Sequence, residues 1–212
     1  MKYIPALKYH LLTPLYDAGI RLTMPEQRLK RRLLEIASIR NGIRALDIGC
    51  GTGTLLVLAS RQTSGATLTG IDPDPTVLRR ARRKLARAGA SVRLEVASAT
   101  ALPFRSGSID RVLSTLMFHH LDSEQKREAL EEAFRVLRCG GEMHIADFGP
   151  PGGAMTRLAS FLVEHVGHEH IQENIRGLIP LLMAGAGFES AGETWAVPTI
   201  FGMVRLYRGV KP

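Results

Sequence analysis

The sequence contains only two cysteines, Cys50 and Cys139, and both stand beside glycines. A disulfide framework needs more than this, so the composition favours a reducing compartment, and we expect the cytoplasm. No apolar run reaches the roughly 20 residues that a membrane helix requires. The opening stretch MKYIPALKYHLLTPLYDAG also lacks the continuous apolar segment of a signal peptide, because Pro5, Lys8 and His10 interrupt it.

Acidic residues are scarce relative to basic ones: 20 Asp and Glu stand against 28 Lys and Arg, a formal net charge of +8. Such an excess can indicate an anionic partner, either nucleic acid or a phospholipid surface. In the densest basic stretch, VLRRARRKLARAG, an apolar helical stripe runs through Val77, Leu78, Ala81, Leu85 and Ala88. The arginines fall mostly on the other faces, and a solvated helix face explains them more simply than a binding patch.

The 212 residues are enough for one domain with a substantial core. From Gly42 onward, short apolar runs alternate with helical patterns. We expect strands at residues 43–49, 66–72, 92–98, 109–115 and 142–148. We expect helices at residues 54–62, 75–89, 123–141 and 178–190. This alternation is typical of βαβ units and predicts a parallel sheet with helices on both faces, an α/β fold.

The two ends of the chain depart from this alternation. Near the C-terminus, strand-like runs at residues 192–198 and 201–209 follow each other closely, which predicts a hairpin at the sheet edge. Additional helical patterns precede the first strand and follow the fifth, and we expect them to roof the crevice beyond the carboxyl ends of the strands. We therefore divide the single domain into a helical lid (1–40), a core (41–150), a helical roof insertion (151–178), and the last helix with the hairpin (179–212).

The stretch RALDIGCGTGTLLVLA, residues 44–59, joins a predicted strand to a helix through a loop with three glycines. A glycine loop lets the backbone approach a ligand, and Asp72, at the end of the next strand, is placed to accept ribose hydroxyls. A dinucleotide fits poorly, because Thr54 stands where its fingerprint has Gly or Ala, and Asp47 would repel a pyrophosphate. A nucleoside with cationic groups and no phosphate fits this loop, and S-adenosylmethionine is such a molecule.

Several motifs occur in a fixed order: LDIGCGTGTL, GIDPDPTVLRRARRKL, VASATALPFRSGSIDRVLS, LMFHHL and AFRVLRCGGEMHIADFG. They resemble the successive motifs of class I S-adenosylmethionine-dependent methyltransferases, and most of all the ubiquinone/menaquinone-biosynthesis C-methyltransferases. The resemblance covers about Ile43 to Gly149. It implies a Rossmann-like, doubly wound sheet of seven mostly parallel strands with an antiparallel last strand, and S-adenosyl-L-methionine as the cofactor.

The resemblance also implies which residues contact the cofactor. The loop would approach the methionine and ribose parts, Asp47 the amino group and Asp72 the ribose hydroxyls. Ser98 departs from the family, which often has Asp or Asn at that position. The implied contacts are Asp47, Gly49, Gly51, Thr52, Gly53, Asp72, Ser98, Ala99 and Ser114.

The motifs that the sequence lacks restrict the classes of molecule that could accept the methyl group. The residues after the fourth strand, Ser-Thr-Leu-Met at 114–117, differ from the Asn/Asp-Pro-Pro-aromatic motif of relatives that methylate amino groups of nucleic acids. Neither cysteine suits a nucleophilic role, two thiols are too few for arsenite, and no carboxylate cluster suits magnesium. We expect metal-independent transfer to a small, hydrophobic, neutral-to-anionic molecule, and no nucleic-acid partner.

Three side chains are candidates for the chemistry. His119 and His120 follow the fourth strand, where a histidine could remove a proton from the acceptor, although either ring could simply pack under the loop. Tyr16 resembles a lid tyrosine of the family that closes over the cofactor, or it packs the lid onto the core. The spacing of His165, His168 and His170 matches no standard metal site, and we expect them to line the acceptor site or lie on the surface.

Two other functions stay open from the sequence. Methylation of a phospholipid amine at an anionic membrane surface would explain the basic composition and the N-terminal helical pattern. A binding module that keeps the cofactor fold without turnover would also carry these motifs. The oligomeric state is not indicated.

Overall fold

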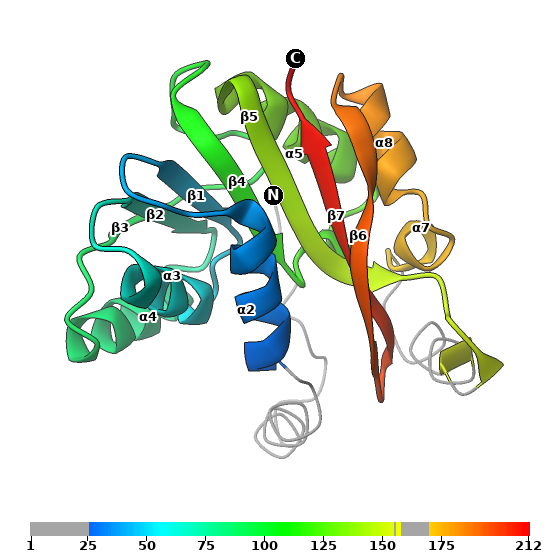
Figure 1. Ribbon diagram of the computed structural model, residues 1–212, viewed down its shortest axis with the longest axis horizontal. Coiled ribbons are helices and arrows are strands. Elements are labelled where there is room, and N and C mark those ends of the chain that lie inside the picture. Colours follow the sequence, from blue (N-terminus) through cyan, green and yellow to red (C-terminus); the bar gives the residue numbers. More distant parts are fainter. Residues whose placement is uncertain (1–25, 155, 158–169) are drawn as a thin grey trace.

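A seven-stranded sheet forms the centre of the computed structural model, which describes residues 26–154, 156–157 and 170–212 (Figure 1). The strand order is β3-β2-β1-β4-β5-β7-β6. The strands are β1 (Arg44–Ile48), β2 (Thr67–Asp72), β3 (Arg93–Val96), β4 (Ile109–Thr115), β5 (Leu137–Gly149), β6 (Glu189–Thr199) and β7 (Gly202–Val210). Strands β1 to β5 pair in parallel, and β7 runs antiparallel to both β5 and β6. The predicted sheet and its edge hairpin are both confirmed.

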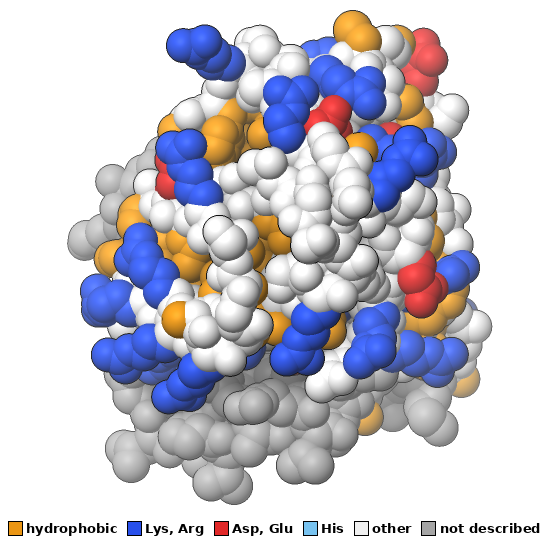
Figure 2. All heavy atoms as spheres, turned by 60° about the vertical axis from the view of Figure 1, so that its left-hand side comes forward, with side chains coloured by type: hydrophobic (Ala, Val, Ile, Leu, Met, Phe, Trp, Pro, Cys, Tyr) orange, Lys and Arg blue, Asp and Glu red, His pale blue; other side chains and the backbone are white. Residues whose placement is uncertain are grey.

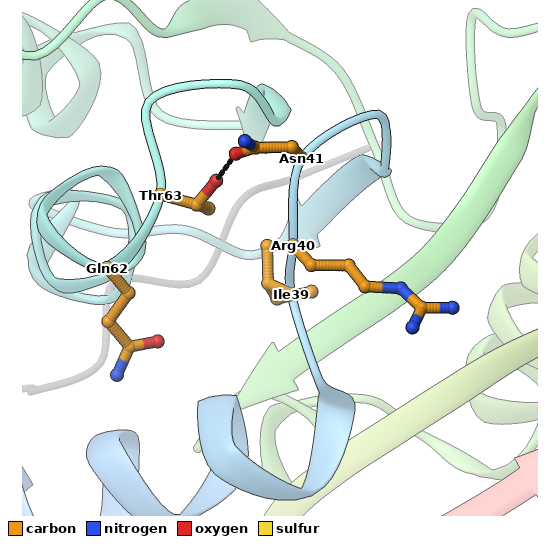
Figure 3. A pocket seen from close by; sticks show the side chains of 5 residues that line it. All are labelled: Ile39, Arg40, Asn41, Gln62 and Thr63. Carbon is orange, nitrogen blue, oxygen red and sulfur yellow. Dashed lines mark hydrogen bonds between the residues drawn. The ribbon is translucent and has the colours of Figure 1, made fainter.

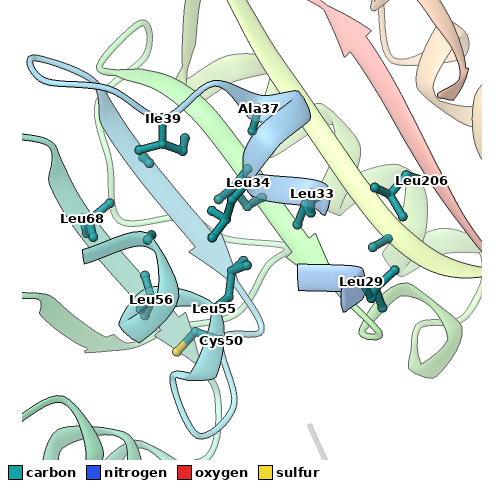
Figure 4. Close-up of a cluster of buried hydrophobic side chains, with 14 of the residues drawn as sticks. Leu29, Leu33, Leu34, Ala37, Ile39, Cys50, Leu55, Leu56, Leu68 and Leu206 are labelled. Atoms are coloured by element: carbon teal, nitrogen blue, oxygen red, sulfur yellow. The ribbon is translucent and has the colours of Figure 1, made fainter. Parts of the chain in front are cut away.

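Helices cover both faces of this sheet (Figure 1). The helices are α2 (Glu26–Ala37), α3 (Thr54–Gln62), α4 (Pro75–Arg87), η1 (Phe118–His120), α5 (Ser123–Val136), α7 (Gln172–Ile175) and α8 (Ile179–Gly185). Apolar side chains of α2, α3 and α4 share one buried cluster on the first face (Figure 4), and those of α5 and α8 share a second cluster on the other face. Strand β5 contributes to both clusters: Ala146 packs in the first and Ile145 in the second, because successive side chains of a strand point to opposite faces of the sheet.

Helix α5 differs from its prediction at both ends. It begins with a capping box on Asp122, whose side chain accepts a hydrogen bond from the Gln125 N–H (2.8 Å), and not on Ser123. It ends at Val136, whereas the helical pattern ran on to Gly141. The segment after Val136 is the start of β5, because Leu137 pairs with Ile109 of β4 and the backbone of Gly141 bonds to Lys211.

The predicted lid and roof are described only in part. Residues 1–25, which include Tyr16, and most of residues 155–175 lie outside the described residues. Helix α2 departs from the expectation of a lid over residues 1–40, because it packs flat against the sheet. Its residues Leu29, Leu33 and Leu34 are each 1% exposed and lie in the same cluster as Leu55 of α3 (Figure 4). None of the described helices is long and apolar enough to cross a membrane.

Candidate functional site

Four neighbouring strands end at the same edge of the sheet, and residues at or next to their ends lie close together there. Asp47 of β1 is paired between Gly70 of β2 and Leu113 of β4. Ser114 of β4 is paired with Ile145 of β5, and Asp72 ends β2. The parallel pairing thus brings predicted site residues from separate segments of the chain to one edge, where open α/β sheets bind ligands.

The glycine loop between β1 and α3 has a left-handed backbone at three positions. The φ angles are 68° at Gly49, 53° at Gly51 and 74° at Gly53. A Cβ at Gly49 would lie only 2.4 Å from Cγ of Met117, so the turn after β4 packs directly on the loop. A Cβ at Gly51 would meet no atom of the described residues within 4 Å, so the part of the chain that the structure describes leaves this side of the loop open to a ligand.

Asp72 holds this loop in place. Its Oδ2 accepts a hydrogen bond from the Gly51 N–H (3.0 Å), and its Oδ1 accepts one from the Asp74 N–H (2.9 Å). Burial raises the pKa of Asp72 above its usual value, although these two N–H groups oppose the shift. Each carboxylate oxygen keeps a second lone pair, so ligand hydroxyls can still be accepted.

Asp47 is the most unusual group of the site. It is 1% exposed, and neither carboxylate oxygen has a hydrogen-bond partner among the described residues. Burial raises its pKa to about 7, against the opposing charge of Lys30 on α2. A buried carboxylate without a partner is costly, and a cationic group of a ligand would satisfy it. The residues present therefore fit a nucleoside ligand that carries an ammonium group.

The other predicted cofactor contacts differ in whether their polar atoms already have hydrogen-bond partners within the protein. Oγ of Ser114 is buried and has no partner among the described residues. Oγ of Ser98, in contrast, lies 2.9 Å from Oγ1 of Thr100 and also accepts the Thr100 N–H, so it is engaged within its own turn. Ala99 is 9% exposed. Thr52 accepts a hydrogen bond from Nζ of Lys84 on α4 (3.2 Å), a contact that sequence reasoning missed.

His119 is buried at the same edge and is paired with a carboxylate that sequence reasoning also missed. Its Nδ1 lies 2.8 Å from Oδ1 of Asp147, near the end of β5. Asp147 also accepts hydrogen bonds from the N–H groups of Phe118 and Phe148, both at 2.8 Å. Burial opposes ionisation of Asp147, but His119, the Phe148 N–H and His120 outweigh it and hold the pKa of Asp147 below the usual value. In the sequence, the one feature that could have indicated Asp147 was its position as an acidic residue at the carboxyl end of an apolar strand.

Of the other predicted histidines, His120 lies beside this pair, His170 lies on the surface, and His165 and His168 are outside the described residues. His120 is exposed, and its ring centroid lies 4.0 Å from that of His119. His165 and His168 are not among the described residues; His170 is described and exposed, and its carbonyl accepts a hydrogen bond from the buried Nζ of Lys126 (2.6 Å). Within the described ranges no three metal-ligating side chains cluster. Metal independence stays a prediction.

A separate hollow lies at the opposite end of β1. It is lined by Ile39, Arg40, Asn41, Gln62 and Thr63 (Figure 3). Two of its polar side chains bond to each other, since Oγ1 of Thr63 donates to Oδ1 of Asn41 (2.5 Å). We assign the functional site to the carboxyl edge and not to this hollow.

Known proteins resemble this chain along most of its length. A family model described as a methyltransferase domain matches residues 45–141. A demethylmenaquinone methyltransferase of Thermus thermophilus is 36% identical over 146 residues, which cover 69% of this chain and 63% of that protein. The ubiquinone/menaquinone biosynthesis C-methyltransferase UbiE of Azotobacter vinelandii is 31% identical over 230 residues, covering 98% of this chain and 87% of that protein. The crystal structure of the S-adenosylmethionine-dependent methyltransferase SibL has the same fold, with a TM-score of 0.75 at 21% identity, over 99% of this chain and 60% of SibL.

The similarity to UbiE extends over nearly the whole chain, and the site that fits an adenosine ligand with a cationic group lies within the matched region. The chain therefore belongs to the class I S-adenosylmethionine-dependent methyltransferases of the UbiE type, with S-adenosyl-L-methionine as cofactor.

Proposed function

We propose that this methyltransferase acts on a small organic acceptor with an apolar body and a neutral-to-anionic reacting group, of the quinone-precursor class, without a metal. The observation that carries the proposal is the His119–Asp147 pair, which lies at the same sheet edge as the glycine loop. A proton acceptor at this place suits an acceptor that carries a hydroxyl or another weakly acidic group. The named relatives, which are quinone methyltransferases, support the same class.

The cofactor site is assigned to the residues at the glycine loop. Asp47 would hold the amino group, since its buried carboxylate has no partner among the described residues. Asp72 would accept the ribose hydroxyls, and Ser114 would contact the methionine part. Ser98 and Ala99 would flank the adenine, and Gly49, Gly51, Thr52 and Gly53 would supply the backbone surface. When bound, S-adenosylmethionine supplies an electrophilic methyl group on a sulfonium.

His119 is proposed as the general base. An ionised carboxylate only accepts hydrogen bonds, so Nδ1 of His119 carries the proton that it donates to Asp147. This tautomer leaves Nε2 as the basic nitrogen, able to take a proton from an acceptor. Asp147 acts as a positioning residue that fixes the ring and its tautomer. His120 and Tyr16 remain further candidates for contact with the acceptor.

Phospholipid amine N-methylation is a second candidate, favoured by the basic residues of α2 and α4. The two functions differ in the acceptor alone, and a screen separates them. The purified chain is incubated with S-adenosylmethionine and either a soluble quinol, a phenol, a thiol or phosphatidylethanolamine vesicles, and release of S-adenosylhomocysteine is measured. The proposal expects turnover with the quinol or phenol and unchanged rates in the presence of a chelator. Turnover on phosphatidylethanolamine alone, or loss of turnover on chelation, contradicts it.

The acceptor site is tested by truncation. Removal of the first twenty residues should lower acceptor turnover more than it lowers the affinity for S-adenosylmethionine. A truncated enzyme that methylates apolar acceptors at the full rate would place the acceptor site elsewhere.

A further inference from the structure

The charges of this protein are divided unequally between the two helical layers. Helices α2, α3 and α4, which cover one face of the sheet, carry eleven Lys and Arg against two Glu. Helices α5 and α8, on the other face, carry three Lys and Arg against four Glu. The positive net charge of the chain is therefore concentrated on one side of the molecule. Figure 2, which brings the side of α3 and α4 forward, shows Lys and Arg gathered low on this face with few Asp or Glu between them.

Most of these guanidinium groups form no ion pair with a carboxylate of the described residues. Among the ion pairs within the described ranges, only Lys30 and Arg32 of this layer take part, each with a glutamate of α2 itself. The exposed arginines of the layer that form no ion pair with a described carboxylate are Arg28, Arg31, Arg61, Arg79, Arg80, Arg82, Arg83 and Arg87. Like charges held this close repel one another, and an anionic partner would relieve the repulsion.

A hollow of about 590 Å³ continues this surface between α2 and β6. It is lined by Gln27, Arg28, Arg31, Arg32, Glu35 and Trp195. Its one carboxylate, Glu35, is paired with Arg32 (3.0 Å), and the guanidinium carbon of Arg28 lies 5.9 Å from the centroid of the Trp195 ring. Trp195 is half-buried and is the only tryptophan of the chain. Arginine pairs with phosphate, and tryptophan favours the interface between headgroups and acyl chains, so this hollow suits a phospholipid headgroup.

We propose that the surface formed by α2, α3, α4 and Trp195, the basic layer, binds an anionic phospholipid bilayer. Nucleic acid explains it less well, because the three helices carry no aromatic side chain and the one aromatic ring of the surface, Trp195, is half-buried with the Arg28 guanidinium over it, so the surface offers no row of rings for successive bases. The basic layer also borders the functional site, since α4 begins at Pro75, shortly after Asp72 in the chain, and the charge of Lys30 on α2 acts on Asp47. This placement would bring the site to a bilayer in which an apolar acceptor dissolves, and this step rests on the proposed acceptor class.

Vesicle binding of the full chain tests the proposal without acceptor or cofactor. The probes are phosphatidylcholine vesicles with and without about 30% phosphatidylglycerol, at roughly 50 and 500 mM salt. We expect binding only to the anionic vesicles, a blue shift of Trp195 fluorescence on binding, and loss of both at high salt. Vesicle binding without any change in Trp195 fluorescence would overturn the assignment of the hollow.

A pair of charge reversals locates the surface. Arg80→Glu with Arg83→Glu changes α4, and Arg105→Glu with Arg127→Glu makes the same change of net charge at exposed positions outside the basic layer. Loss of one surface Lys or Arg weakens binding to an anionic bilayer about fivefold, so the α4 pair should weaken it roughly 30-fold or more and the control pair far less. Thermal unfolding of each variant verifies that it folds.

The outcomes separate this proposal from the proposed function. Equal losses in both pairs, or salt-sensitive binding to a nucleic-acid duplex without binding to vesicles, would overturn the membrane surface. Turnover of a detergent-dissolved quinol should be unchanged in both pairs, because none of the four positions belongs to the site. Absence of turnover on every acceptor with intact vesicle binding would instead count against the proposed function alone.

Discussion

Nδ1 of His119 lies 2.8 Å from Oδ1 of Asp147, and this contact joins the turn after β4 to the end of β5. Both side chains are buried, and the backbone N–H groups of Phe118 and Phe148 share the same carboxylate. The imidazole is therefore held in one orientation by a group that stays ionised. A ring fixed in this way beside a ligand site is arranged for proton transfer.

Asp147→Asn should remove the negative charge that fixes the orientation and tautomer of the His119 ring, while keeping one oxygen that accepts hydrogen bonds from the backbone. We expect turnover to fall by about 10²–10⁴-fold, with the affinity for S-adenosylmethionine within a few-fold of wild type, because the amide favours the wrong tautomer of His119. The pH–rate profile should change shape as well as height. Asp110→Asn on β4 is the matched control, since Asp110 pairs with Arg44 and Arg138 near the other end of the sheet. Parallel losses of affinity and turnover in Asp147→Asn would indicate a purely structural role.

Asp47→Asn should stabilise the ligand-free protein and weaken cofactor binding. The folded-state pKa of Asp47 is raised from 3.8 to about 7, so its contribution to stability is present below pH 4 and is lost as the pH rises through 7. Above that pH, removing the charge should raise the free energy of unfolding by roughly 1–4 kcal/mol, observed as a higher melting temperature. Asp74→Asn keeps the cap of α4 and serves as the control. A lower melting temperature for Asp47→Asn would contradict the account.

The affinity for S-adenosylmethionine should depend on pH through the same group. An ammonium group prefers the ionised carboxylate, and with a pKa of about 7 only a small fraction of Asp47 is ionised at pH 6. We expect binding to be about tenfold weaker at pH 6 than at pH 8, with release of a proton on binding near pH 6. Calorimetry in buffers of different ionisation enthalpy measures that proton. If the affinity of the Asp47→Asn variant changed with pH as steeply as that of the wild type, another group would be responsible for the pH dependence.

Asp72→Ala should weaken cofactor binding by about 1.5–3 kcal/mol, the range for hydrogen bonds to a charged group. Part of this loss would come from the loop, because Asp72 also holds the N–H of Gly51. Far-UV circular dichroism should show a retained fold. Asp74→Ala removes only the helix cap, which costs about 1 kcal/mol of stability, and should leave affinity nearly unchanged. An unchanged dissociation constant in Asp72→Ala would remove this residue from the site.

Two alanine substitutions in the glycine loop should have different effects. In Gly49→Ala the new Cβ would lie 2.4 Å from Cγ of Met117, so the clash adds to the strain of a left-handed backbone and should destabilise the fold by more than about 1 kcal/mol. In Gly51→Ala the Cβ meets no described residue within 4 Å, so among these residues only the backbone strain remains, and the larger effect should fall on cofactor affinity. Met117→Ala should partly restore the stability of Gly49→Ala. Equal stabilities of the two single variants would contradict the packing described here.

The strand and helix alternation, the edge hairpin and the glycine loop were all predictable from the sequence, because each depends on local spacing of apolar residues and glycines. The start of β5 was not, since LRCGG reads locally as the end of a helix. Its pairing with Ile109 and Lys211 overrides that preference, and those partners lie 28 and more residues away in the sequence.

The sequence by itself determined the type of chemistry, since the order of motifs, the carboxylate of Asp47 and the glycines follow one another along the chain. Tertiary structure alone decided which side chains from distant parts of the chain contact the site residues. Asp147 reaches His119 across 28 residues, Lys84 reaches Thr52 across 32, and Lys126 reaches the carbonyl of His170 across 44. Such contacts depend on how neighbouring strands align and how helices pack, and no local pattern records them. For the same reason, the concentration of positive charge on one helical layer appears only when α2, α3 and α4 lie side by side.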